Sequence, residues 1–269
     1  MQKPIDSSKR RKTGHGSTAT PVGQLDGIVY GPDGVAFDSK NKSIVTVDWI
    51  SNRLKLFSQD GKFLSKLGSH GLQKGQLNFP RGVCIQPATH NVIVTDRDRV
   101  QVFSSPHVSS SSADSFSPLA SLFSVGSADK VGRGPSQFND PRGICCTARG
   151  DIIVADSWNH RMQIIDCKGR YVRAFGRQGQ KNNQFQHPSG VFVQEDANRM
   201  IIADSSNFRL CMWSVDGCEP VLAVPIEGYP RGICNYPRTH RIVVSCTGPH
   251  DIQVLDSKTK NEWNVIQRF

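Results

Sequence analysis

A proline-x-glycine motif that recurs five times constrains the fold of this chain more than any other feature of its sequence. Its prolines are 48, 61, 47 and 42 residues apart; they are Pro32, Pro80, Pro141, Pro188 and Pro230. The longest interval holds a serine-rich insertion at 104–118, and without it the period is near 47 residues. A repeat of this length predicts similar supersecondary units that stack on one another and share a continuous core.

Each repeat unit has the pattern of four β-strands. In the first unit, a strand after the glycine is followed by a β-branched run, an alternating run, a turn and a last run, at 44–47, 53–57, 59–61 and 63–67. β-Branched runs between turn residues are typical of strands, and alternation is typical of strands with one exposed face. Four strands per period without helical periodicity predict an all-β propeller of four-stranded blades.

The repeat divides the chain into two parts. The propeller is expected at 29–269, with the serine-rich segment as a loop insertion. Residues 1–28 carry the basic cluster 9–12 and are expected to be a flexible segment. Within this segment, Gly16 and Gln24 repeat the spacing of Gly68 and Gln76 in a later linker, which indicates the remnant of an outer strand.

An aspartate ends four of the five β-branched runs, and in three units an arginine follows five residues later. The pairs are Asp48 with Arg53, Asp156 with Arg161, and Asp204 with Arg209. We interpret them as ion pairs that brace the connection, because a feature repeated in every blade usually answers a structural need. Two units depart from the pattern. The second unit has a shortened loop at 96–99, and the fifth has Cys246 in place of the aspartate and Asp251 in place of the arginine.

The sequence argues against several classes of protein. No apolar run reaches the length of a membrane span, and no secretory signal precedes the basic cluster. The eight cysteines include no Cys-x-x-Cys pair, so we expect free thiols, no metal site and a cytoplasmic location. Cys84, Cys145 and Cys234 each follow a Gly-Val or Gly-Ile step and are predicted to be small buried strand residues.

No enzyme is expected either. The eight histidines do not recur at one repeat position, and the chain contains neither a nucleophile elbow nor a phosphate-binding glycine-rich loop. The sequence therefore predicts a binding domain without a cofactor or a small-molecule substrate.

The strand-end segments identify a family resemblance. Asp48-Trp49-Ile50-Ser51-Asn52-Arg53-Leu54, 156–162 and 204–210 resemble NHL repeats, as do the Pro-x-Gly-Val motif and linkers such as Asn183-Gln184-Phe185. The resemblance covers 29–269 and is greatest to the NHL domains of TRIM-NHL proteins and Brat. It implies a six-bladed ring that recognises RNA through one face and acts in post-transcriptional repression. Only five units are visible, so the chain is either a fragment of a longer protein or a ring of five blades.

The charge is consistent with an anionic partner. The net charge is +10, of which +7 falls on 29–269. The linkers and the loops between second and third strands emerge on one face. The basic and aromatic residues predicted there, as contacts for RNA or another partner, are Arg81, Arg142, Arg231, Arg97, Arg99, Trp158, His160, Arg177, Lys181, Phe208 and Tyr229. Guanidinium groups pair with phosphates, while unstacked bases lie on aromatic rings.

We therefore predict an RNA-binding propeller that recognises single-stranded or stem-loop RNA through a positively charged face. The alternative is a protein-interaction platform, such as the substrate-recognition part of a TRIM-type ubiquitin ligase. Ligase activity would require a RING module, whose paired Cys/His spacings are absent from this chain. A structural interpretation also stays open, in which Phe79 and Tyr229 pack between blades and scattered arginines keep a β-protein in solution.

Overall fold

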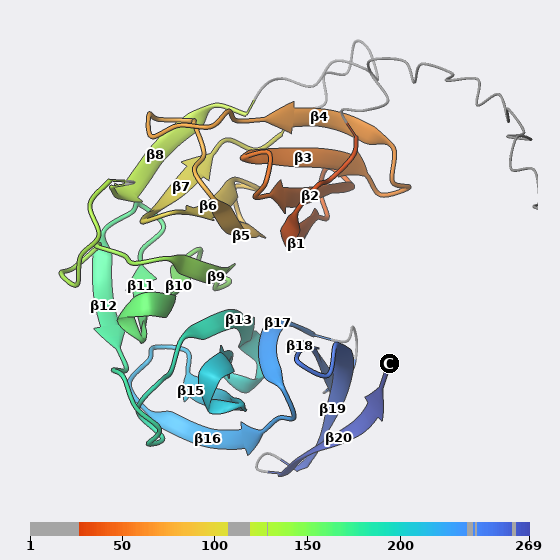
Figure 1. Cartoon of the computed structure of the whole chain (residues 1–269), viewed down its shortest axis with the longest axis vertical. Coiled ribbons are helices and arrows are strands. Elements are labelled where there is room, and N and C mark those ends of the chain that lie inside the picture. The colour runs from red at the N-terminus through yellow and green to blue at the C-terminus, as the bar shows by residue number, and fades with distance from the viewer. Residues whose placement is uncertain (1–26, 107–118, 128, 236–238, 240, 260–261) are drawn as a thin grey trace, which may run out of the picture.

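A computed structural model describes residues 27–106, 119–127, 129–235, 239, 241–259 and 262–269 (Figure 1). The predictions for the basic N-terminal segment up to residue 26, and for 107–118 of the serine-rich insertion, lie outside these ranges. The described residues form an all-β fold with three short 3-10 helices, η1 (Ser157–Asn159), η2 (Glu195–Ala197) and η3 (Ser205–Asn207).

The strands begin and end close to the predicted boundaries. In chain order they are β1 (Pro32–Asp38), β2 (Ser43–Asp48), β3 (Arg53–Ser58), β4 (Phe63–Leu67), β5 (Pro80–Ile85), β6 (Val92–Asp96), β7 (Arg99–Phe103), β8 (Ser121–Gly126), β9 (Pro141–Cys146), β10 (Ile152–Asp156), β11 (Arg161–Ile165), β12 (Tyr171–Phe175), β13 (Pro188–Gln194), β14 (Arg199–Asp204), β15 (Arg209–Ser214), β16 (Pro220–Pro225), β17 (Tyr229–Asn235), β18 (Arg241–Thr247), β19 (Asp251–Thr259) and β20 (Glu262–Arg268).

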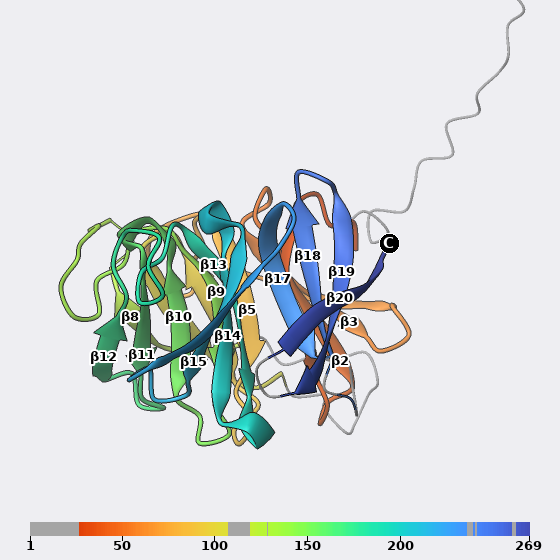
Figure 2. The ribbon, with the colours of Figure 1, turned by 90° about the horizontal axis from the view of Figure 1, so that it is seen from below.

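These strands form five antiparallel sheets of four consecutive strands each, which confirms the predicted blades. The blades surround a central axis, with β1, β5, β9, β13 and β17 innermost and the last strand of each blade outermost (Figure 1). The strands run between the two ends of the ring, where the connections lie (Figure 2). The sixth blade that the resemblance implies is not among the described residues.

The hydrophobic core lies between neighbouring blades rather than inside any one of them. Ile153 and Met162 of the third blade pack with Val191, Met200 and Ile202 of the fourth. Three similar clusters fill the junctions between the other blades that follow one another in the chain. The second strands of the second and third blades, β6 and β10, are buried on both faces, which explains their continuous apolar sequences, whereas β18 of the fifth blade alternates between buried and more exposed residues.

The strand-end aspartates brace the blades, as predicted. Asp156 accepts hydrogen bonds from Arg161 Nε at 2.8 Å and from the backbone amide of Asn139 at 2.8 Å. Asp204 accepts from Arg209 Nε at 2.7 Å and from the amide of Gln186 at 2.6 Å. Each aspartate therefore fixes the linker that leads into its own blade from the blade before it.

In the first unit, the predicted partner of Asp48 was wrong. Asp48 pairs with Lys55 at 2.9 Å, whereas Arg53 donates to the carbonyl of Gly68 at 2.8 Å. Lys55 stands where the second and third blades have buried glutamines, Gln101 and Gln163, and its longer side chain brings a charge to the aspartate.

Candidate nucleic-acid interface

One end of the ring carries both classes of loop that the sequence singled out. In the strand register, Pro80 lies opposite Asp96, and Pro141 lies opposite Asp156. The start of each innermost strand therefore lies beside the end of the second strand. We call this end, with the linkers and the loops between second and third strands, the top face.

A cavity of about 620 Å³ opens on the axis and is lined by residues from all five innermost strands. Arg81 of β5, Arg142 of β9 and Arg231 of β17 contribute to its lining. Asp33 and Ser189 stand at the same position after the proline in the other two blades. The structure thus brings together three of the predicted arginines, from three different blades, around one opening.

The three arginines differ in how well they are neutralised. Arg81 contacts Asp33 at 3.3 Å and Arg142 contacts Asp140 at 3.0 Å. Arg231 donates only a long bond, 3.4 Å, to the hydroxyl of Thr247 among the described residues. Burial lowers the pKa of Arg231, and repulsion from Arg142 lowers it further. An anion at the opening would relieve this repulsion.

Aromatic side chains lie around the opening in pairs, one pair at each of three blade junctions. We call them the junction pairs: Trp49 with Phe79, Trp158 with His187, and Phe208 with Tyr229, at ring-centroid distances of 6.5, 5.2 and 4.7 Å. Phe79, Trp158, Phe208 and Tyr229 are all more than 40% exposed. Arg81 connects the arginines of the axial opening with the junction pairs, because its guanidinium lies 5.3 Å from the Trp49 ring centre.

The backbone at the junctions is held in an uncommon conformation. Phe79, Asp140 and His187, each directly before an innermost-strand proline, have φ between +46° and +52°. Their amides donate across the junction, to Asn52 Oδ1 at 2.7 Å, to Asp98 Oδ1 at 3.3 Å and to His160 Nδ1 at 3.1 Å. Left-handed conformations in residues other than glycine often mark functional sites, because surrounding contacts must stabilise them.

His160 has a positioning role that the sequence did not reveal. It is only 6% exposed, and its Nδ1 accepts the His187 amide, so that nitrogen carries no proton in this arrangement. Burial lowers the pKa of His160, and repulsion from His187 lowers it further. His160 therefore orients His187, and the exposed ring of Trp158 lies beside it.

The remaining predicted residues lie in different environments. Arg97 is exposed in the β6–β7 loop of the top face. Arg99 is 4% exposed and donates to Asp96, Leu72 and Gln76, so it braces the second blade and offers no free group to a partner. Arg177 and Lys181 are exposed on the β12–β13 linker; Arg177 lines a cavity on the outer wall of the ring.

Four residues of this interface were missed or assigned only to packing from the sequence: Asp33, Asp140, Phe79 and His187. A positional signal existed for all of them, because each directly precedes or follows an innermost-strand proline. Their chemistry differs from blade to blade, so the repeat pattern alone did not select them.

Two kinds of feature are absent from the part of the chain that the structure describes. It contains no group of three or more His, Cys, Asp or Glu side chains that is placed to hold a metal ion. It also contains no helix long and apolar enough to span a membrane.

Comparison with known proteins agrees with this arrangement. A family model described as NHL repeat matches residues 138–165, which run from the linker before β9 to the end of β11. This part of the third blade is therefore similar to an NHL repeat. The matched segment includes Asp156 and Arg161, whose ion pair braces the third blade.

The chain is similar to parts of longer proteins. It is 33% identical over 112 residues to protein brain tumor of Drosophila melanogaster, which covers 41% of this chain and 11% of that protein. It is 33% identical over 75 residues to RING finger protein nhl-1 of Caenorhabditis elegans, which covers 28% of this chain and 8% of that protein. The chain thus spans about a tenth of the length of these curated relatives.

Solved structures show the same fold at low sequence identity. A nidogen/laminin complex has a TM-score of 0.64 at 15% identity and covers 88% of this chain and 79% of the other. Streptogramin B lyase has a TM-score of 0.60 at 12% identity and covers 89% and 68%. These structures support the propeller fold alone.

Proposed function

We propose that this propeller binds single-stranded or looped RNA through its top face, as a non-catalytic module of post-transcriptional regulation. The observation that carries the proposal is the arrangement of Arg81, Arg142 and Arg231 around the axial opening, encircled by the exposed junction pairs. Phosphates require cations and unstacked bases require flat rings, and this face offers both within one surface.

The spacing of the two groups favours a flexible strand over a rigid duplex. The junction pairs stand at separate blade junctions, so bases must turn outward from the backbone to reach them. A single strand or a loop has unstacked bases that are free to do so, whereas duplex bases are paired and stacked. We therefore expect phosphates at the axial opening and bases at the junction pairs.

The similarity to brain tumor and nhl-1 adds support of a different kind, since the family resemblance implies recognition of RNA through one face. A sixth blade, a longer parent protein and a cytoplasmic location remain predictions. None of them is needed for the binding mode, because the five described blades supply every residue of the proposed surface.

The proposal is tested by changing the three axial arginines together. In Arg81→Ala/Arg142→Ala/Arg231→Ala, we expect the dissociation constant for a fluorescein-labelled single-stranded RNA to rise by about tenfold or more, measured by fluorescence anisotropy. The matched control is Lys40→Ala/Arg149→Ala/Lys168→Ala, which removes the same charge from exposed turns at the opposite end of the ring. Equal losses in the two variants would show that net charge, and not the top face, determines binding.

Salt dependence separates this function from the protein-interaction alternative. Three phosphate contacts predict that log K falls with log salt concentration with a slope of roughly −2 for a single strand. A flat salt profile, together with unchanged RNA affinity in the axial variant, would instead favour a protein partner on the same face.

A further inference from the structure

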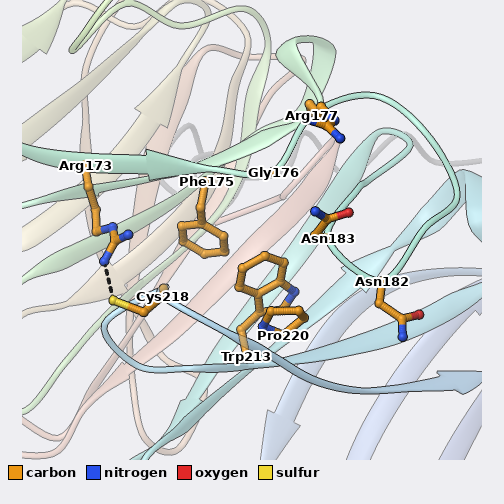
Figure 3. A pocket seen from close by; sticks show the side chains of 10 residues that line it. Arg173, Phe175, Gly176, Arg177, Asn182, Asn183, Trp213, Cys218 and Pro220 are labelled. Atoms are coloured by element: carbon orange, nitrogen blue, oxygen red, sulfur yellow. Dashed lines mark hydrogen bonds between the residues drawn. The ribbon is translucent and has the colours of Figure 1, made fainter.

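A second cavity, of about 430 Å³, lies on the outer wall of the ring between the third and fourth blades (Figure 3). It is bounded by β12 and its linker on one side and by β15 and the β15–β16 turn on the other. Its lining includes Arg173, Phe175, Arg177, Trp213 and Cys218, and no carboxylate is present among the lining residues.

Cys218 is exposed at one end of this cavity and contacts a guanidinium group. Nη1 of Arg173 lies 2.7 Å from Cys218 Sγ and also donates to the carbonyl of Asp216 at 3.0 Å (Figure 3). The Asp216 carboxylate, the opposing charge in this turn, accepts hydrogen bonds from Ser214 Oγ, from the Cys218 amide and from the Cys218 thiol. The guanidinium of Arg173 beside Cys218 attracts an anionic reagent to this turn.

Two donors beside the thiol lack acceptors. Trp213 Nε1 and Arg173 Nε are buried without a hydrogen-bond partner among the described residues, and Trp213 is only 3% exposed. In Figure 3 the indole nitrogen is on the side of the cavity toward Asn182 and Asn183. Buried donors are nearly always satisfied, so an occupant with acceptor oxygens would complete this site.

The neighbouring junction shows that this cavity is not a general property of the fold. There, Phe123 stands in the position of Arg173 and packs its ring on Gly169 of the β11–β12 turn. That turn also has an exposed cysteine, Cys167, which contacts no guanidinium among the described residues. The chain therefore contains two exposed turn cysteines at neighbouring junctions, of which Cys218 contacts a guanidinium and lines a cavity.

We propose that Cys218 is a site of mixed-disulfide formation with a small thiol that carries carboxylate groups, of the glutathione type. The thiol group reacts beside Arg173, while the body of the adduct lies on Phe175 and Trp213. Its carboxylate and carbonyl oxygens accept from Arg177, Asn182 or Asn183 and from the indole N–H.

The chemical step is a thiol–disulfide exchange and balances without a further oxidant. The Cys218 thiolate attacks one sulfur of a disulfide R–S–S–R, a new Cys218–S–S–R bond forms, and the original S–S bond breaks. The leaving R–S⁻ takes a proton from water. Free thiol in excess reverses the reaction, so the modification is reversible.

The test compares the two turn cysteines in the same molecule. The chain is incubated with oxidised glutathione, and the adduct at each cysteine is measured over time by peptide mass spectrometry. We expect Cys218 to react about tenfold faster than Cys167, because Arg173 and Arg177 at the cavity beside Cys218 attract the anionic disulfide. Equal rates at the two cysteines would overturn the proposal.

Variants separate the roles of charge and cavity. Arg173→Gln should slow Cys218 to about the rate of Cys167 and leave Cys167 unchanged, whereas Arg173→Lys should keep most of the difference. An unchanged Cys218 rate in Arg173→Gln contradicts the role of the guanidinium. Cystamine, a cationic disulfide, tests the carboxylate in the unaltered chain: we expect a lower Cys218 to Cys167 ratio with cystamine, and an equal ratio contradicts the proposed ligand class.

Discussion

The junction between the fifth and first blades differs from the four junctions between blades that follow one another in the chain. A Cβ on Gly190 of the fourth blade would lie 2.0 Å from the carbonyl oxygen of Arg231, whereas one on Gly232 would meet only Ser245 Oγ, at 3.1 Å, among the described residues. Val35 is 68% exposed, although Val191 at the same repeat position is 6% exposed.

The difference shows that apolar side chains in this fold are buried by contact between two neighbouring blades. The first and fifth blades have the same motif as the others, yet among the described residues each has one face that packs in no core cluster. Cys234 illustrates the effect: it was predicted to be buried like Cys84, and it is exposed on the face of β17 that no described blade covers. A repeat unit of a propeller is thus stabilised mainly by contacts with the next one.

The largest effect is expected from the glycines of the innermost strands. Gly190→Ala should lower the free energy of unfolding by about 3 kcal/mol, because its methyl group cannot fit against the β17 backbone and the blades must separate. Gly232→Ala should cost less than about 1 kcal/mol, since only the Ser245 hydroxyl has to move. Urea denaturation measures both, and similar losses would show that the two junctions are alike in solution.

Truncation of the strand valines should have a smaller effect with the same asymmetry. Val191→Ala removes methyl groups that pack in the core between the third and fourth blades, at a cost of about 2 kcal/mol. Val35→Ala changes an exposed side chain and should cost less than about 0.5 kcal/mol. If Val35→Ala proved as destabilising as Val191→Ala, its face would be covered in solution.

The smallest expected effect is a dependence of stability on pH. It compares the junction of the third and fourth blades, which contains His160, with the junction of the first and second blades, which has Asn52 at the same position. The pKa of His160 is lowered from its usual 6.5 by burial and by His187, so the unfolded chain binds a proton more readily than the folded one. Stability should therefore decrease as pH falls through 6.5. His160→Asn copies Asn52, keeps an acceptor for the His187 amide and should reduce this decrease.

Denaturation midpoints at pH 7.5 and 5.5 measure this effect in both proteins. The residual pH dependence of the variant reports on His187, whose pKa is also lowered, first by burial and then by Arg142. An unchanged pH dependence in the variant would rule out His160 as its source.

The blades could be predicted from the sequence because each strand is specified by residues close together in the chain. The Pro-x-Gly motif, the β-branched run and the strand-end aspartate each depend on neighbours a few residues away. The identity of ion partners depends on side-chain reach across a blade. For this reason Lys55 in place of Arg53, and the complete burial of Arg99, could not be derived from spacing.

The candidate site was predictable only as a set of loops. The convergence of Arg81, Arg142 and Arg231 follows from the repeat, but Asp33 and Asp140 beside them reduce the charge. Contacts between blades join residues far apart in the chain, 27 positions for Asn52 and Phe79 and 48 for Asp33 and Arg81, and no local pattern reports them. Whether the first and fifth blades meet is likewise a property of the ring.

The hydrogen bonds from the residue before each proline have a consequence for engineering. Phe79 and His187 belong to one blade but are fixed by Asn52 and His160 of the blade before it. Every contact position of this kind is thus assembled from two consecutive repeats. Grafting a single blade into another propeller would separate each half-site from its support, so a transplanted recognition surface requires at least two adjacent blades moved as one block.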